Sequence, residues 1–383
     1  MAPEKPITIQ RGSYTVQKLP AIPSPFETHP FIFKTSILTT WSLWVLYTAC
    51  QLVLAIRFQY TRQEHVQWAV VISEILLDFP SAVLAFSIVL GLFSVPDEGP
   101  RPRYSLLDGP APDVDVLVTC CGESVGVISN TAAAAATQDY PANHLRVYVL
   151  DDGGSEELCS AIERLNLQIA SRLTEPAPII YLSRKLGPGE HSHFKSGNLR
   201  FGIHESQTRF RERSNRPTDE GEPPDRFIAC LDADMIPTRD WLRKMVPHML
   251  LNDDLGIVCP PQNYYNIPKS SLDILGQQTD FDIYFSVQEA LNDRLGAAMC
   301  TGSGYVARRS ALESIGGWPL ANCGEDYMCS TILSDQGWGI AFVSRTLIYL
   351  ASPLILIART IKKIYSMYST QLNIDTIVSY EPA

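Results

Sequence analysis

The sequence has no excess of positive charge and no regular arrangement of cysteines. Its 383 residues include 31 Lys and Arg against 41 Asp and Glu, which gives a net charge of −10 at pH 7. A nucleic-acid-binding surface needs basic residues in excess, so this balance argues against nucleic acid as a partner. The nine cysteines are scattered, and the adjacent pair Cys120 and Cys121 has no metal-binding spacing. These cysteines indicate free thiols in a reducing compartment.

Two long apolar segments lie near the N-terminus, and neither resembles a cleaved signal peptide. Residues 36–56 contain no charge and have about the length of a membrane-spanning helix. This first segment begins too deep in the chain, and is too long, for a signal peptide. Residues 69–93 form a second apolar run, which two carboxylates and a proline interrupt. The sequence predicts two transmembrane helices within residues 31–93, with a buried amphipathic helix as the alternative for the second.

Basic residues precede the first apolar run and follow the second. They are Lys5, Arg11, Lys18, Lys34, Arg101 and Arg103. Two spans would place the N-terminus and everything after residue 94 on one side, which the positive-inside tendency makes cytosolic. The sequence therefore predicts an integral protein of the plasma membrane or an endomembrane, with its globular part in the cytosol.

The rest of the chain divides into tails, a linker and a globular domain. Residues 1–30 are rich in proline and polar residues and are expected to form a flexible tail. Residues 94–113 hold five prolines, which favour a linker. The globular domain is expected over residues 114–344, and an atypical C-terminal tail over residues 345–383.

Short apolar strands alternate with helical patterns from residue 114 onward. The predicted strands are Val114–Thr119, Leu145–Leu150, Ile179–Leu182 and Phe227–Leu231, and the predicted helices between them are Ser129–Gln138 and Glu156–Ile169. This alternation is typical of an open, mainly parallel sheet with helices on both faces. We therefore predict an α/β fold, in which ligands bind outside the carboxyl ends of the strands.

Two carboxylates, Asp232 and Asp234, directly follow the fourth predicted strand. Magnesium is commonly bound by one or two carboxylates together with phosphate oxygens of a substrate. A lone Asp-x-Asp is more often a solvated loop or a helix cap. The metal interpretation therefore depends on the residues that accompany it.

Similar polar residues follow the first two predicted strands. Thr119 and Glu123 come after the first strand, and Asp151 and Asp152 come after the second. A carboxylate at a strand end can accept a hydrogen bond from a pyrimidine N–H or a ribose hydroxyl. The alternative is that Asp152 and Gly153 form a turn that caps the next helix.

Further polar groups come later in the chain. Lys195 could meet a phosphate and Asn198 a ribose, unless both belong to a solvated helix start. Gly302 and Gly304 would let a loop approach a sugar, or form an ordinary turn. Asp326 opens a predicted helix, where a carboxylate acts as a cap or as a general base.

Together these motifs resemble the membrane-embedded family 2 glycosyltransferases, which include cellulose, chitin and hyaluronan synthases. The matching motifs, in family order, are Thr-Cys-Cys-Gly-Glu123, Leu-Asp-Asp152-Gly-Gly, His-Phe-Lys195-Ser-Gly-Asn198-Leu, Leu-Asp232-Ala-Asp234, Pro-Pro261-Gln262-Asn, Thr-Gly302-Ser-Gly304 and Gly-Glu325-Asp326. The resemblance implies a GT-A fold, which is a Rossmann-like open mixed sheet. It also implies a nucleotide-sugar donor, a Mg²⁺ or Mn²⁺ ion, and inversion at the anomeric carbon.

The resemblance also implies roles for individual residues. The residues implied to bind the nucleotide sugar are Thr119, Glu123, Asp151, Asp152, Lys195, Asn198 and Asp232. Asp232 and Asp234 would hold the metal, and Asp326 matches the catalytic base, with Glu325 beside it. The residues implied on the acceptor side are Gln262, Gly302, Ser303 and Gly304.

The C-terminal residues depart from the family pattern, which continues to a Gln-x-x-Arg-Trp segment and further membrane helices. The apolar residues 347–358 are about half a membrane span in length and contain Pro353. One interpretation of this stretch is a helix lying in the membrane interface, and another is unrelated sequence.

The sequence therefore predicts a membrane-anchored inverting glycosyltransferase. Its donor would be a UDP-sugar, with a GDP-sugar as the alternative. Its acceptor would be a polysaccharide, a lipid or a small hydrophobic molecule. The rival hypothesis is a catalytically inactive family member that binds the donor or acts as a scaffold.

Overall fold

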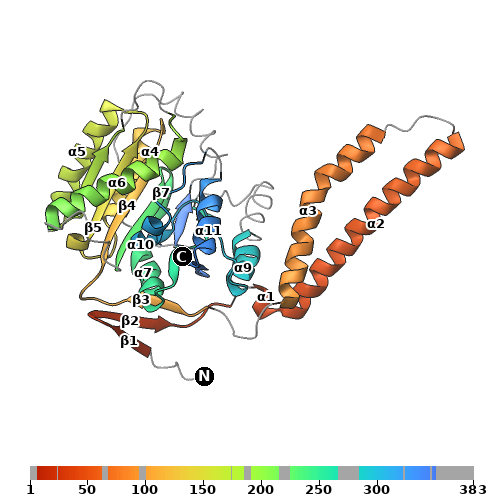
Figure 1. The fold of residues 1–383 in the computed structure, drawn as a ribbon, viewed down its shortest axis with the longest axis horizontal. Coiled ribbons are helices and arrows are strands. Elements are labelled where there is room, and N and C mark those ends of the chain that lie inside the picture. The colour runs from red at the N-terminus through yellow and green to blue at the C-terminus, as the bar shows by residue number, and fades with distance from the viewer. Residues whose placement is uncertain are drawn as a thin grey trace.

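A mixed seven-stranded sheet organises the larger part of the molecule (Figure 1). In sheet order the strands are Gly339–Phe342 (β12), Leu255–Cys259 (β9), Val306–Arg308 (β11), Arg226–Asp232 (β7), Asp113–Cys120 (β4), Leu145–Asp151 (β5) and Ile179–Leu182 (β6). Strand β11 runs antiparallel to both neighbours, and the other pairings are parallel. The predicted α/β fold with a mixed, mainly parallel sheet is confirmed.

The computed structural model describes residues 7–23, 25–62, 68–94, 101–173, 175–184, 191–214, 225–265, 284–321, 324–345 and 347–350. The apolar residues 351–358 of the predicted tail lie outside the described residues.

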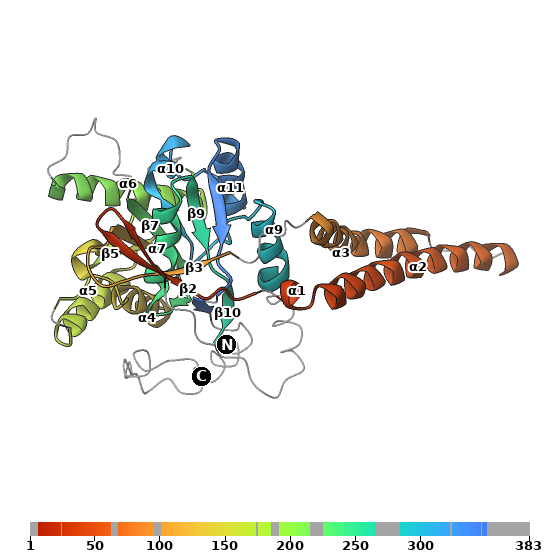
Figure 2. The same cartoon turned by 90° about the horizontal axis from the view of Figure 1, so that it is seen from below.

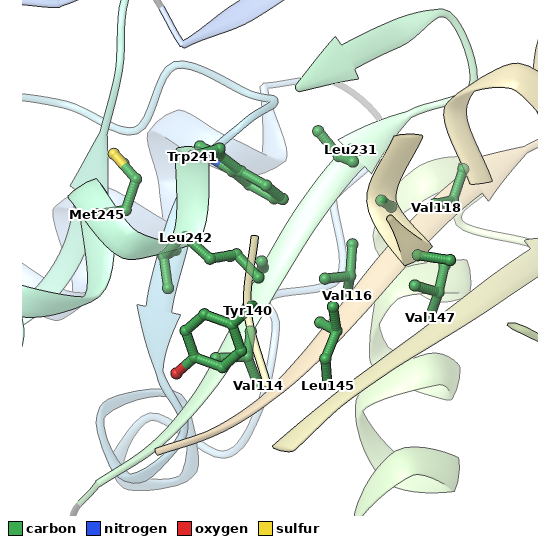
Figure 3. Close-up of a cluster of buried hydrophobic side chains, with 14 of the residues drawn as sticks. Val114, Val116, Val118, Tyr140, Leu145, Val147, Leu231, Trp241, Leu242 and Met245 are labelled. Atoms are coloured by element: carbon green, nitrogen blue, oxygen red, sulfur yellow. The ribbon is translucent and has the colours of Figure 1, made fainter. Parts of the chain in front are cut away.

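Helices cover both faces of the sheet. The side chains of the central strand β4 point alternately to the two faces, so each face presents apolar side chains that a helix can cover. Val114, Val116 and Val118 of β4 join one buried cluster (Figure 3), and Leu117 joins the other. The first face is covered by Val125–Ala136 (α4), Glu156–Ala170 (α5) and Trp241–Leu251 (α7). The second face is covered by Phe194–Ser214 (α6), Arg309–Ser314 (α10) and Glu325–Asp335 (α11). Short helices also form at Pro25–Thr28 (α1), Ala142–His144 (η1), Tyr284–Glu289 (η2) and Ala290–Arg294 (α9).

One of two smaller sheets corrects the expected tail and linker. Ile7–Arg11 (β1) and Tyr14–Leu19 (β2) form a hairpin, and Arg103–Leu106 (β3) pairs with β2. The N-terminal segment is therefore ordered over these strands, because β2 buries Val16 in the core. The expected linker likewise contains β3.

The other small sheet lengthens the globular domain. Ile348–Leu350 (β13) pairs with Gln262–Tyr264 (β10) on one side and Met235–Pro237 (β8) on the other. Ile348 is completely buried in the same core cluster as β4. The fold therefore continues past residue 344, where its end was expected.

A hairpin of two long helices projects from the domain (Figure 2). The helices are Pro30–Arg62 (α2) and Trp68–Ser94 (α3), and the C-terminal end of α3 packs on α9 through Leu92 and Leu291. Among the helices of the described residues, one, Pro30–Thr61, is long and apolar enough to cross a membrane. The predicted pair of membrane spans is thus reduced to one candidate.

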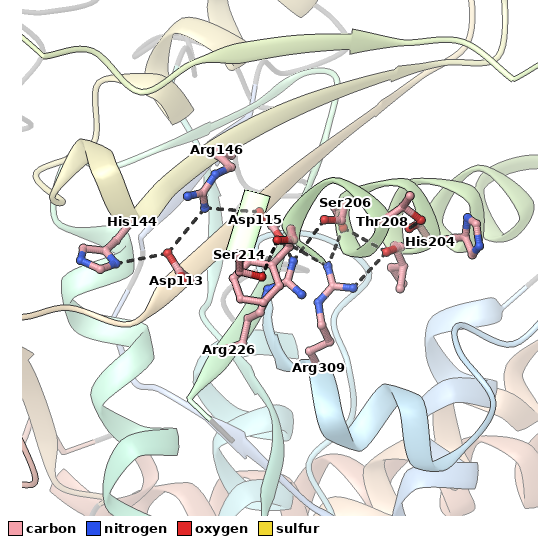
Figure 4. A network of polar contacts seen from close by, with 12 residues as sticks. Asp113, Asp115, His144, Arg146, His204, Ser206, Thr208, Ser214, Arg226 and Arg309 are labelled. Atoms are coloured by element: carbon pink, nitrogen blue, oxygen red, sulfur yellow. Dashed lines mark hydrogen bonds and ion pairs between the residues drawn. The ribbon is translucent and has the colours of Figure 1, made fainter. Parts of the chain in front are cut away.

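A buried ionic network ties the sheet to α6 and α10 on its second face (Figure 4). The Asp115 carboxylate lies 2.7 Å from the Arg226 guanidinium and 3.2 Å from that of Arg309. Arg309 also donates to Ser206 of α6, and Arg226 lies over the Phe210 ring. Asp115 and Arg226 lie near the starts of β4 and β7, so the network occupies the end of the sheet opposite the strand-end motifs.

Candidate functional site

The carboxyl ends of three neighbouring strands bring the first group of predicted residues together. The parallel register sets Thr119 of β4 opposite Asp232 of β7, and Cys120 opposite Asp151 of β5. The Thr119 hydroxyl donates to a carboxylate oxygen of Asp232 at 3.2 Å. These contacts define one edge of the candidate site.

Lys195, in the first turn of α6, is the centre of the site's charge. Its ammonium lies 2.5 Å from the Asp232 carboxylate and 3.9 Å from that of Glu325, and it donates to the Gly302 carbonyl at 2.8 Å. Burial alone would lower the pKa of Lys195, but Asp232 and Glu325 raise it above its ordinary value. The side chain is therefore charged at neutral pH and links three segments.

Asp234 supplies a second carboxylate close to Asp232. Burial, followed by the neighbouring charge of Asp232, raises the pKa of Asp234. A cation would relieve both effects. Within the described residues there is no group of three or more His, Cys, Asp or Glu that could hold a metal by itself. The pair suits Mg²⁺ or Mn²⁺ because such ions accept one or two carboxylates and take further oxygens from a substrate.

Asp151 and Asp152 are adjacent in sequence but differ in their contacts. The Asp151 carboxylate is buried and accepts bonds from the amides of Gly153 and Ser155 and from the Tyr181 hydroxyl. Asp151 therefore holds the turn after β5. The alternative interpretation of this motif expected that role for Asp152. Asp152 instead receives two bonds from the Arg184 guanidinium, at 2.5 and 2.6 Å.

Arg184 was not predicted, although it follows β6 by only two residues. Its guanidinium also donates to the Ser192 hydroxyl and to the Phe194 carbonyl, immediately before Lys195. Phe194 has a φ of 45°, which is rare for a large side chain. Arg184 thus joins the end of β5 to the strained turn that presents Lys195. Its position at a strand end was the available sequence signal.

At this edge of the site Asn198 lies in the interior, and Glu123 lies on the surface. Asn198 is buried, and its amide donates to the Leu150 carbonyl at 2.8 Å, so it supports the end of β5. Glu123 is exposed and accepts a bond from the Cys121 amide at 2.6 Å. Of the two, Glu123 is the one open to a ligand.

The loop that contains Gly302, Ser303 and Gly304 contacts both the end of β7 and the start of the helix that carries Asp326. The Ser303 hydroxyl accepts a bond from the Asp232 amide, and the Gln262 side chain donates to the Ser303 carbonyl. A Cβ on Gly302 would lie 2.8 Å from the Asp326 carboxylate. Gln262 and Ser303 therefore shape the loop from behind, and Gly302 is the residue that faces Asp326.

Asp326 and Glu325 occupy the first turn of α11, where the helix macrodipole favours negative charge. Glu325 turns toward Lys195, as noted above. The half-buried Asp326 contacts the loop through Gly302. The structure thus brings the expected base close to the expected diphosphate residues, through Gly302 and Lys195.

A sequence profile described as "Glycosyltransferase like family 2" matches residues 111–363. The chain belongs to this family. Family 2 relatives include cellulose synthase 1 catalytic subunit [UDP-forming] of Komagataeibacter xylinus, which is 25% identical over 235 residues. That match covers 61% of this chain and 27% of the relative.

A second relative and one solved structure are also similar to this chain. A cellulose synthase catalytic subunit [UDP-forming] of Xanthomonas axonopodis is 23% identical over 236 residues, which are 61% of this chain and 28% of that relative. The fold is similar to that of the mannosyltransferase PcManGT from Pyrobaculum calidifontis in complex with GDP-Man and Mn²⁺, with a TM-score of 0.50 and 18% identity. The alignment covers 81% of this chain and 79% of that one, so the predicted GT-A-like fold is confirmed.

Proposed function

We propose that this protein transfers a sugar from a nucleoside-diphosphate sugar to an acceptor hydroxyl, with inversion at the anomeric carbon. The observation that carries the proposal is the convergence of Asp232, Lys195, Gly302 and Asp326 on one edge of the sheet. Such a transfer needs a protein base that takes the proton of the acceptor hydroxyl. It also needs groups that stabilise the negative charge of the leaving diphosphate. The site separates them onto different elements.

Asp326 is proposed as the general base. Its carboxylate sits at the loop that would carry the acceptor, and it would take the proton of the attacking hydroxyl. Gly302 leaves open the space beside that carboxylate. Glu325, bound to Lys195, is proposed to hold the lysine rather than to react.

The donor's diphosphate is proposed to lie against Lys195, Asp232 and Asp234. A Mg²⁺ or Mn²⁺ held by Asp232 and Asp234 would neutralise charge on the leaving group when bound. Thr119, Glu123 and Asp152 would line the nucleoside end. A UDP-sugar is the proposed donor, since the bacterial cellulose synthases that resemble this chain are described as UDP-forming.

The helix α2 is proposed to anchor the domain in a membrane, with α3 returning beside it to a catalytic domain in the cytosol. Its candidate span is apolar, and the most apolar part of it is not buried within the protein. Large apolar side chains along it, such as Leu46 and Leu54, are exposed. An acceptor at the membrane surface, either lipid or growing glycan, fits this arrangement.

The test is turnover of UDP-sugars by the full-length protein in membranes, with and without Mn²⁺ or Mg²⁺. Asp326→Asn should reduce turnover by about 10²- to 10⁴-fold, because it removes the base while preserving shape. The donor affinity of this variant, measured by calorimetry, should stay the same. Asp335→Asn, at the exposed end of the same helix, is the matched control and should retain full turnover.

Asp234→Ala should instead weaken donor binding in the presence of metal. If Asp326→Asn and Asp234→Ala both leave turnover unchanged, the site is misassigned. Donor binding without transfer to any acceptor would favour the inactive scaffold. Product sizing then separates the acceptor classes, since a glycan acceptor gives a ladder of lengths and a small acceptor gives a single added sugar.

A further inference from the structure

A hollow of about 220 Å³ opens on the face of the sheet that α7 covers. It lies between β3, α7 and the segment that joins β12 to β13. Its lining residues are Arg103, Tyr104, Lys244, His248, Val343, Arg345 and Leu347. We call it the basic hollow, because the charged groups in this lining are all cations.

The positive charge of the basic hollow is only partly compensated. Among the described residues, the one carboxylate that pairs with this lining is Asp240, which contacts Lys244 and lies 3.9 Å from Arg345. Arg103 donates to the Pro20 carbonyl and forms no ion pair in the described part of the chain. One carboxylate therefore accompanies three cations and contacts two of them, in a protein whose net charge is −10.

The like charges oppose one another. Burial, followed by the neighbouring Arg345 and Arg103, lowers the pKa of Lys244 to about 8. Burial and Arg345 likewise lower the pKa of Arg103. An anion among these groups would replace repulsion by attraction.

His248 gives an independent indication that the hollow accepts a ligand. Its side chain is only 4% exposed, yet it lines the hollow with its ring edge-on to Tyr104. Neither ring nitrogen has a hydrogen-bond partner among the described residues. The ring nitrogens are not among the fully buried polar atoms that lack a partner, so they are open to the hollow. A neutral imidazole can supply one N–H donor to an anion.

The basic hollow is separate from the candidate donor site. Lys195 and Asp326 belong to α6 and α11, on the opposite face of the sheet from α7. No hydrogen bond or ion pair connects the lining of the hollow to Lys195, Asp232 or Asp326 within the described segments. An anion here would not be the diphosphate of the sugar donor.

We propose that the basic hollow binds a phosphate group through Arg103, Lys244, Arg345 and His248. A single phosphate matches this lining because its oxygens can accept charge-assisted hydrogen bonds from several cations at once. The phosphate is either free or the headgroup of an anionic lipid. The second source is within reach because Arg103 follows the end of α3 at Ser94 by nine residues. The proposal does not depend on sugar transfer.

The test is a calorimetric titration of inorganic phosphate into the full-length protein in phosphatidylcholine nanodiscs. Arg345→Gln and Arg103→Gln should each weaken phosphate binding at least about tenfold, because each removes a charge-assisted contact. Arg345→Lys, which keeps the charge, should restore part of the affinity. Arg164→Gln, on the exposed face of α5, is the matched control and should bind like the unaltered protein. Asp234→Ala should also bind normally, because it alters only the donor site.

A second titration in nanodiscs that contain phosphatidic acid identifies the source. Loss of phosphate binding there, restored in phosphatidylcholine, would identify the lipid headgroup as the natural occupant. Unchanged binding would identify a free phosphate. The proposal is overturned if phosphate does not bind in phosphatidylcholine nanodiscs, or if Arg345→Gln and Arg103→Gln bind it as tightly as the Arg164→Gln control. Circular dichroism of each variant shows whether the fold is retained.

Discussion

Gly302 is the residue at which the backbone and the proposed base meet. It has a φ of 80°, and a Cβ there would lie 2.8 Å from the Asp326 carboxylate. Gly302→Ala should therefore displace Asp326 and reduce the turnover number by at least about tenfold, since misplacement by about 1 Å can cost a hundredfold. Donor affinity should change much less. Steady-state kinetics and calorimetry would separate the two effects.

The control for this change is Gly337→Ala. Gly337 has a similar φ of 88°, but a Cβ there would meet nothing within 4 Å. Both variants carry the backbone strain of an alanine at positive φ, about 1–2 kcal/mol, and only one touches Asp326. Equal turnover in the two variants would mean that the contact with Asp326 is unimportant.

His248 makes the stability of the domain depend on pH. Burial, then the charges of Arg101 and Arg103, lower its pKa to about 3. Between about pH 6.5 and pH 3 the unfolded chain binds a proton at His248 that the folded chain does not, so stability falls as pH falls. From pH 7 to pH 5, His248→Asn should lose about 2 kcal/mol less stability than the unaltered protein.

Urea unfolding in detergent micelles at the two pH values would measure this difference. His204→Asn is the control, because that imidazole is exposed on α6. A pH dependence that is the same for all three proteins would show that His248 is protonated in the folded state.

The sequence predicted which residues meet at the site better than it predicted their contacts. Thr119 and Asp232 were expected together because parallel strands end at one edge, and the register confirms that placement. The difference between Asp151 and Asp152 was not predictable, because the pleat and the turn decide which neighbour points inward. Arg184 was missed because its contacts arise only when a distant turn folds back over β5.

At the scale of elements, the Asp115 network fixes α6 and α10 to the sheet. Removing one partner of a buried ion pair leaves uncompensated charge, which typically costs about 3–5 kcal/mol. Asp115→Asn should therefore lower the free energy of unfolding by about that amount. Turnover per folded molecule should be unchanged, because β7 separates Arg226 from Asp232 by about 20 Å.

Asp108→Asn is the matched control for this prediction. Asp108 also pairs with an arginine, Arg243, but its side chain is 96% exposed. Exposed pairs are worth about 0–1 kcal/mol, so this variant should keep nearly all of its stability. Urea unfolding of both variants tests the comparison, and similar losses would contradict the assigned importance of burial.

The strands of the main sheet were predictable, and the small sheets were not. Val114–Thr119 and Phe227–Leu231 are buried on both faces, so both are mostly apolar in the sequence, with Asp115 as the one charged residue. The hairpin of β1 and β2 was hidden because it contributes a single buried residue, Val16, within a polar and proline-rich segment. β13 has three residues, and long-range pairing with β8 rather than local pattern makes it a strand.

At the scale of the whole molecule, the exposed apolar surface of α2 should determine where the protein resides. Leu46 lies near the middle of the candidate span and is 58% exposed. An arginine at the centre of a membrane helix costs about 2.5–3.5 kcal/mol. Leu46→Arg should therefore reduce the share of protein that stays in the membrane pellet after alkaline carbonate extraction.

Leu167→Arg is the control, because Leu167 is also exposed but lies on α5 of the globular domain. It should leave the pelleted share unchanged. If neither variant changes the share of protein in the membrane pellet, α2 does not hold the protein in a bilayer. The same conclusion follows if both variants lower that share equally.

The short Lys195–Asp232 pair has a consequence for the order of events at the site. A divalent ion that binds Asp232 must compete with the ammonium of Lys195, and the freed ammonium then needs a new anion. A diphosphate can supply that anion, so ion and donor should each raise the affinity of the other by the same factor. Because Lys195 and Asp232 satisfy each other's charge, the site should bind either ligand weakly in the absence of the other.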